Sequence, residues 1–279
     1  MFELDNKKMA SVVSSFQVPV KPEILTKIQN IMDDDEPKIE EISALISSDV
    51  GLSAAIIKII NSPFYGMNRR ISEIKQAVMM LGLKTINGLV TALLLKYSFT
   101  GETCISLERF WDDALDIANA MSFIGNIVKN EVPVDMLYSI GLFHDCGIPL
   151  LALKYPNYED VLKEANHLNT NSVALEEKHY QISHTVLGYY VASSWHLPKE
   201  ICQLIAQHHD SDYLTYTQDP QERLIYAILK IAENMIAKAT SKNESPDWSE
   251  VQESVLEVVG LSPTDYIDLE DEFSEHFHN

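Results

Sequence analysis

Glycine and proline are scarce in this chain of 279 residues, which contains 10 of the first and 11 of the second. A β-protein made of many short strands needs more of both, because they form its turns. No alternating run of apolar and polar residues of useful length occurs either. Apolar residues instead recur at helical spacing, as at Ile24, Leu25, Ile28 and Ile31. The sequence therefore predicts an all-α fold, arranged as a multi-helix bundle.

Cysteines and export signals are also lacking. The three cysteines are odd in number, widely spaced and form no CxxC pair, which suits a reducing compartment. The first ten residues contain no apolar segment of the kind that a signal peptide needs. The longest apolar stretch, residues 77–95, is interrupted by Lys84 and Asn87, so it predicts buried helices rather than a membrane span. We expect a cytoplasmic protein that does not bind membranes.

Basic residues are outnumbered, with 21 Lys and Arg against 41 Asp and Glu, and the formal net charge is −20. A chain this acidic repels phosphate backbones and anionic lipids, so we expect no nucleic-acid partner. Glycine loops that bind phosphate are missing, since neither GxGxxG nor GxxxxGK followed by Ser or Thr occurs. The GxSxG element of serine hydrolases is absent as well. The usual motifs of nucleotide binding and acyl transfer are thereby excluded.

A polar segment at residues 98–106 indicates where the chain divides. We place an N-terminal extension at residues 1–17 and a first helical half at residues 18–100. A second helical half follows at residues 101–240, and a helical tail at residues 241–279 ends the chain. The first half is expected to form an N-terminal helical subdomain that packs against the second half.

Several local signals predict details of the helices. Gly82 is expected to interrupt a long apolar helix, and Ser183 is expected to cap a helix that begins at His184. Residues 172–180 predict an amphipathic helix with its glutamates and lysine on the outer face. Residues 247–250, with the sequence DWSE, predict a capping box at the start of a tail helix.

The segment Gly141–Gly147, with the sequence GLFHDCG, places adjacent His144 and Asp145 between two apolar runs. Burying an imidazole and a carboxylate side by side is costly unless each finds a partner. A metal ion is one such partner, because histidine nitrogens and aspartate oxygens are both good ligands. In the alternative, the two residues cap a helix end and bond to each other or to the backbone. The segment alone leaves both alternatives open.

Three further histidines, His184, His208 and His209, and the acidic Glu233 belong to the ends of predicted helices. Each has an ordinary explanation, since the helix dipole favours a cation at a C-terminus. Short links between antiparallel helices would bring these ends together, and such a set of imidazoles and carboxylates suits Zn, Mn or Fe. These residues are candidate metal ligands, and a purely structural role as cap and core residues stays open beside that.

The 141–147 segment resembles the Gly-Leu-Leu-His-Asp-Ile-Gly signature of the HD superfamily of metal-dependent phosphohydrolases. Further stretches narrow the resemblance to the HDOD domain, over residues 18–236. Members of that family are all-helical and mostly regulatory proteins of bacterial signalling, and many have lost metal ligands. The resemblance implies an HD-domain-like bundle with an N-terminal helical subdomain. The other stretches that carry it are Ser62–Gly66, Ile71–Ile74, Ala77–Gly82, Phe110–Trp111, His184–Gly188, Trp195–Pro198 and His208–His209.

The resemblance also implies a set of metal ligands, in which His144 and Asp145 keep the His-Asp pair. Asp113 stands where HD enzymes are expected to carry their first histidine, and Glu233 replaces the last aspartate. The other three histidines correspond to those of the two-metal HD-GYP branch, whereas the Gly-Tyr-Pro element of that branch is absent. The implied ligands are His144, Asp145, His184, His208, His209, Asp113 and Glu233.

Two functions fit this pattern. The first is a bacterial signal-transduction module with a regulatory or protein-interaction role, whose partners are signalling proteins. The alternative is a metal-dependent phosphohydrolase for phosphomonoesters or phosphodiesters, in which His144 and Asp145 would be catalytic. A divalent ion (Fe, Mn, Zn or Mg) fits both functions, but only the enzyme requires it. We expect no basic side chain beside the site to hold a phosphoester, because residues 141–147 contain none and Lys154 is the nearest lysine that follows.

Overall fold

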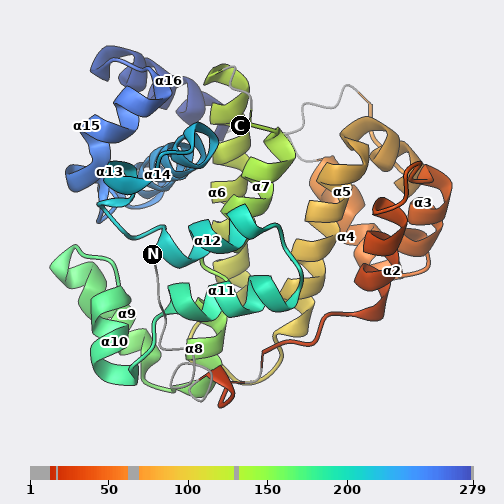
Figure 1. Ribbon diagram of the computed structural model, residues 1–279, viewed down its shortest axis with the longest axis horizontal. Helices are drawn as coiled ribbons and strands as arrows, with labels where there is room; N and C mark the ends of the chain where they lie inside the picture. The colour runs from red at the N-terminus through yellow and green to blue at the C-terminus, as the bar shows by residue number, and fades with distance from the viewer. Residues whose placement is uncertain (1–12, 17, 62–68, 129–131, 278–279) are drawn as a thin grey trace.

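The computed structural model describes residues 13–16, 18–61, 69–128 and 132–277. These residues form helices joined by short links, and no strand occurs among them, so the all-α prediction is confirmed. Figure 1 shows helices α2 to α5 on one side of the molecule, α6 and α7 at its centre, and the later helices around the other side.

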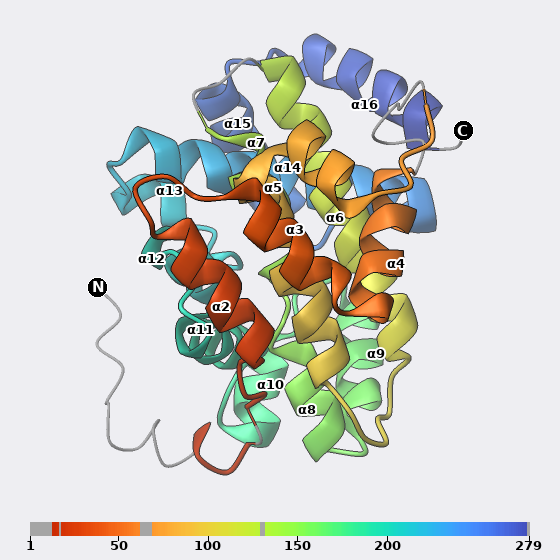
Figure 2. The same cartoon turned by 90° about the vertical axis from the view of Figure 1, so that its right-hand side faces the viewer.

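The described residues of the first half form four helices that bury isoleucine and leucine side chains against one another. Helices α2, α3 and α4 each pack on α5, and Figure 2 shows these three in front of it. The predicted motif Ser62–Gly66 and most of the predicted extension lie outside the described residues, and the proposed domain boundaries stay predictions. The bounds are Glu23–Met32 for α2, Ile39–Ser47 for α3, Val50–Ile60 for α4 and Ile74–Ser98 for α5.

Helix α5 is kinked at Gly82, whose φ of 81° and ψ of 162° are not helical. Glycine adopts such angles without steric cost, so the predicted interruption is confirmed. By length and composition alone, the stretches Ile74–Ser98 and Met136–Lys154 could each cross a membrane. Both are packed in the bundle, since α5 contacts α3, α4 and α7 and the most apolar window of the second stretch is 78% buried. Burial among helices accounts for much of their apolar character.

The second half is built around α6 and α7, which make the most extensive contact between described helices. Helix α7 is strongly apolar, and its Leu137 and Ile140 are fully buried. It leads directly into the turn 144–147, so the candidate residues begin inside the core. The bounds are Leu107–Val128 for α6, Val134–Phe143 for α7, Ile148–Lys154 for α8, Tyr158–Leu168 for α9, Val173–Tyr180 for α10, His184–Ser194 for α11, Lys199–Gln207 for α12, Tyr213–Tyr216 for α13, Pro220–Ser241 for α14, Trp248–Val259 for α15 and Pro263–Phe277 for α16.

Helix α6 carries an aspartate whose ionisation opposes folding. Burial and the neighbouring Asp113 and Asp112 raise the pKa of Asp116 to about 6. Between its ordinary pKa and about 6, the folded chain holds a proton that the unfolded chain has released, so stability falls as the pH rises through this range. Above about pH 6 the free energy of unfolding falls no further. Because solvent screens this half-buried group, the total loss is limited to about 1 kcal/mol.

We therefore expect Asp116→Asn to raise the melting temperature by about 2 °C at pH 7.5. At pH 4 the variant and the wild type should melt together, because the wild-type carboxyl is then protonated in the folded chain. Thermal unfolding followed by circular dichroism at both pH values checks this. An equal gain at pH 4 would show that the substitution acts through packing or helix propensity instead of charge.

Candidate metal centre

The turn that follows α7 meets the start of α11 and the end of α12. His144 is the first residue after α7, His184 is the first residue of α11 and His208 follows α12. Their side chains surround the carboxylate of Asp145. Its Oδ1 lies 3.3 Å from Nε2 of His184 and 3.2 Å from Nε2 of His208, and its Oδ2 lies 3.3 Å from Nε2 of His144. Three imidazoles thus present the same ring atom to one carboxylate.

The opposite nitrogen of each ring faces a hydrogen-bond acceptor. Nδ1 lies 2.8 Å from the carbonyl oxygen of Gly141 in His144 and 2.9 Å from that of Ile205 in His208. In His184 the acceptor is a carboxylate oxygen of Glu176, at 2.8 Å. A carbonyl or carboxylate acceptor fixes the proton on Nδ1 and leaves the lone pair on Nε2, as in histidines that bind metals.

His208 and Asp145 make a buried contact that a cation between them would stabilise. Burial lowers the pKa of His208 despite the nearby Asp145, so its Nε2 carries a lone pair. This atom and Asp145 Oδ1 are both acceptors, both buried and both without a hydrogen-bond donor. Two ligand atoms about 2.1 Å from a shared metal at tetrahedral angles are about 3.4 Å apart. The observed separation of 3.2 Å is therefore close to that of two ligands on one ion, and these residues fit a divalent metal.

Electrostatics inside the cluster follow the same pattern. Burial alone would raise the pKa of Asp145, but the three surrounding histidines hold it well below its usual range. Burial would lower the pKa of His144 and His184, and their carboxylate neighbours raise both. Metal binding at these two rings therefore competes with their protonation, as is general for histidine ligands.

Glu176 is a member of the site that the sequence prediction missed. The residues 172–180 were expected to turn their glutamates outward, but Glu176 is fully buried and this part of the prediction is wrong. One of its oxygens accepts hydrogen bonds from Tyr158 and Ser172. The other accepts from the backbone N–H of His184 at 2.7 Å, which caps α11. Ser183, the predicted cap, makes no capping hydrogen bond.

His209 lies beside both His208 and His184, with 4.2 Å and 5.2 Å between the ring centroids. Four potential ligand atoms lie within 4.8 Å of one another: one ring nitrogen each of His184, His208 and His209, and one oxygen of Asp145. Nδ1 of His209 is 2.6 Å from Oδ2 of Asp247. The predicted capping box at residues 247–250 is therefore wrong, because the Asp247 side chain makes no cap and points to this histidine instead.

A pocket of about 560 Å³ opens onto the cluster. The two remaining predicted ligands, Asp113 and Glu233, line it together with His144 and Asp145. Neither belongs to the set of closely spaced ligand atoms, and Glu233 is held by Lys230 at 2.8 Å. Such a volume is typical of small-molecule sites.

The same pocket contradicts the expectation that no basic residue lies near the site. Arg109, on α6, is one of its lining residues, although it is more than thirty positions from the His-Asp pair in the sequence. Lys230 was missed too, since it stands in an apolar run of α14 and is fully buried. Its charge is already committed, because it contacts both Glu233 and Asp247. Arg109 is therefore the basic side chain that this pocket offers to a ligand.

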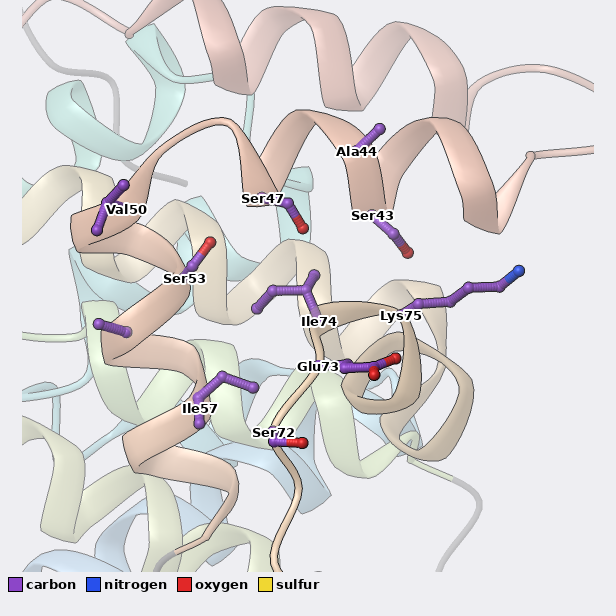
Figure 3. Close-up of a pocket in the computed structure, with 11 residues that line it drawn as sticks. Ser43, Ala44, Ser47, Val50, Ser53, Ile57, Ser72, Glu73, Ile74 and Lys75 are labelled. Carbon is purple, nitrogen blue, oxygen red and sulfur yellow. The ribbon is translucent and has the colours of Figure 1, made fainter.

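A second pocket, of about 640 Å³, lies between α3, α4 and the start of α5. Figure 3 shows the hydroxyl groups of four serines around it, with Glu73 and Lys75 at one edge. Lys75 is already paired with Glu40 at 2.9 Å. Its lining includes no histidine, cysteine or aspartate, so the candidate chemistry belongs to the pocket of the second half. The four serines are Ser43, Ser47, Ser53 and Ser72.

Comparisons with known proteins agree with this architecture. Residues 18–211 match the HDOD domain. A curated relative from Treponema pallidum, an uncharacterized protein, is 26% identical over 199 residues, which are 69% of this chain and 38% of the relative. The chain thus spans about two fifths of the length of that relative.

Solved structures share the fold over almost the whole chain. An HDOD domain protein of unknown function from Geobacter sulfurreducens is 22% identical, with a TM-score of 0.69 and coverage of 98% of this chain and 99% of the other. A "putative phosphohydrolase" from Shewanella amazonensis is 16% identical, with a TM-score of 0.73 and coverage of 96% and 94%. At these identities the likeness establishes the fold alone. The family match over most of the chain, on the arrangement of helices described above, shows that this protein belongs to the HDOD domain family.

Proposed function

We propose that this chain is a regulatory HDOD module that binds a divalent metal ion through His144, Asp145, His184 and His208, with His209 beside them. The observation that carries the proposal is the contact between Nε2 of His208 and Oδ1 of Asp145, which lie 3.2 Å apart and are both buried without a hydrogen-bond partner. A bound cation removes the repulsion between these two acceptors. Ring nitrogens of His184 and His209 lie in the same set of closely spaced ligand atoms and then add to its affinity.

The donor set narrows the choice of metal. Imidazole nitrogens suit Zn and Fe, and a set that mixes imidazoles with a carboxylate also accepts Mn, whereas Mg prefers oxygen ligands and retains its water. Glu176 and two backbone carbonyls orient the rings from behind, an arrangement that strengthens histidine ligands. We therefore place Zn, Fe and Mn ahead of Mg among the four candidate ions.

The proposed regulatory role also covers the location and the partners of the protein. The chain acts in the cytoplasm of a bacterium, and its partners are signalling proteins. Its net charge of −20 argues against nucleic acids and anionic membranes as partners. The HDOD membership supports a signalling role, because that family is mostly regulatory.

A second candidate function is that of a metal-dependent phosphohydrolase. It is favoured by the pocket beside the cluster, where Arg109 lies together with His144 and Asp145. A guanidinium group suits a phosphoryl oxygen. A divalent ion in the centre would supply Lewis-acid catalysis for attack on a phosphoester. In this function Arg109 would bind the substrate, and the buried histidines would keep the metal in place.

Metal content decides whether the centre is real. We expect protein purified without chelators to contain about one equivalent of Zn, Fe or Mn by elemental analysis. His144→Ala removes a proposed ligand and should bind the same ion about 100-fold more weakly or worse, whereas His167→Ala, which removes an exposed histidine of α9, should bind it as the wild type does. Metal-free protein that gains no metal on reloading with these ions would contradict the proposal. If the metal-loaded protein released nitrophenol from nitrophenyl phosphomonoesters or phosphodiesters, that result would support the phosphohydrolase function.

A further inference from the structure

Asp247 stands outside the part of the chain that matches the HDOD domain, which ends at residue 211. It precedes α15, yet its side chain does not cap that helix. The carboxylate is buried and accepts hydrogen bonds from three separate segments. Oδ1 accepts from the amide of Asn171 at 2.8 Å. Oδ2 accepts from Nδ1 of His209 at 2.6 Å and from Lys230 at 2.9 Å.

Lys230 explains why the carboxylate stays in this position. Its ammonium group is fully buried and lies between Asp247 and Glu233, 2.9 Å and 2.8 Å from their oxygens. A buried ammonium costs several kcal/mol unless it is paired, so Lys230 holds both carboxylates against it. If Asp247 turned away from His209, the buried ammonium group of Lys230 would lose one of its two carboxylate partners.

The consequence for His209 is a single tautomer. Nδ1 of this ring lies 2.6 Å from Oδ2 of Asp247. A carboxylate at this distance acts as a hydrogen-bond acceptor, so the ring proton lies on Nδ1. Nε2 then keeps its lone pair, on the ring that lies beside His184 and His208. Asp247 itself does not belong to the set of closely spaced ligand atoms.

We propose that Asp247 is a positioning residue of the metal centre, which holds His209 with Nε2 free for the ion, while Lys230 and Asn171 hold Asp247. The inference rests on the proposed metal-binding function. It makes residues beyond the HDOD match part of the site, and it couples the packing of the tail to metal binding. By linkage, the ion stabilises the docked tail as much as the tail stabilises the bound ion.

The test compares Asp247→Asn with Asp268→Asn in the full chain, because Asp268 is an exposed aspartate of the same tail. Zn binding is measured by competition with a chromophoric chelator. We expect Asp247→Asn to bind Zn about 10- to 100-fold more weakly, and Asp268→Asn to match the wild type. Long-range ¹H–¹⁵N spectra of the metal-free proteins should show His209 with its proton on Nδ1 in the wild type and in a mixture of tautomers in Asp247→Asn.

Asn171→Ala serves if Asp247→Asn does not fold, because it removes one hydrogen bond to Asp247 and no charge; we expect about threefold weaker Zn binding. Wild-type affinity in Asp247→Asn, or an unchanged His209 tautomer, would overturn the inference. In the absence of a folded Asp247→Asn, wild-type affinity in Asn171→Ala would do so. A wild type that binds no Zn, Fe or Mn overturns the proposed function itself, and this is read before any variant is compared.

Discussion

Replacement of Glu176 by glutamine is expected to weaken metal binding by about 10- to 100-fold and to lower the free energy of unfolding by about 3 kcal/mol. The carboxylate is fully buried and accepts from both the ring and the backbone N–H of His184. Burial would raise its pKa, but His184 holds it below its ordinary value. An amide oxygen is a weaker acceptor than a carboxylate oxygen, and the NH₂ group of glutamine would face one of the present donors. His184 then loses its fixed orientation.

The matched control is Glu177→Gln, because Glu177 is the next residue of α10 and is exposed. Zn affinity is measured by chelator competition, and stability by urea and thermal unfolding of the metal-free proteins. We expect the melting temperature of Glu176→Gln to fall by about 6 °C, while Glu177→Gln stays within about 1 °C of the wild type. Equal Zn affinity in the two variants would contradict the assigned role of Glu176 and leave it as a structural residue only.

Helices were predictable from local sequence because their signals are local. The apolar spacing in α2 and the glycine that kinks α5 at position 82 depend on residues a few positions apart. The kink needs a backbone with φ of 81°, which glycine alone adopts freely. Such features form in nearly the same way whatever the rest of the chain does, so the all-α architecture follows from them.

The histidines of the centre were predicted from a motif, but the residues that orient them were not. Glu176 and Glu177 are adjacent and chemically identical, and only packing buries one and exposes the other. A neighbouring His184 eight positions away gives no signal until α10 and α11 are placed together. The helical tail shows the same limit, because Asp247 lies in a sequence that favours a capping box. Its carboxylate instead pairs with the buried ammonium of Lys230 and with His209, so it does not cap the helix.

The positions of two basic residues also differ from the sequence prediction. The acidic sequence has no basic residue near the His-Asp pair, yet Arg109 lines the pocket because α6 packs beside α7. Lys230 follows Leu229 in an apolar run, where a helical pattern predicts a core residue. It is indeed in the core, but as the partner of two carboxylates. Tertiary contact therefore decides which charges are available to a ligand.

Gly147 is the residue where the largest loss of stability is expected on adding a single methyl group. A Cβ atom there would lie 2.0 Å from the backbone oxygen of His184 and 2.7 Å from the backbone nitrogen of Gly188. The φ of −80° is open to any residue, so the demand is for space and not for conformation. Both obstacles are backbone atoms of α11 and cannot rotate aside. Gly147→Ala must therefore push the turn after α7 away from α11.

We expect Gly147→Ala to cost about 3 kcal/mol of unfolding free energy, measured by urea unfolding of the metal-free chain. The matched control is Gly51→Ala on α4, where the added Cβ would meet only an oxygen of Asp49 at 3.5 Å. Alanine is the better helix former, so this control should be as stable as the wild type or slightly more so. Because His184 belongs to the displaced helix and Asp145 to the turn, Gly147→Ala should also bind Zn more weakly. If Gly147→Ala were as stable as Gly51→Ala, α11 could shift at little cost in free energy. The contact between Gly147 and α11 would then not fix the position of the metal centre.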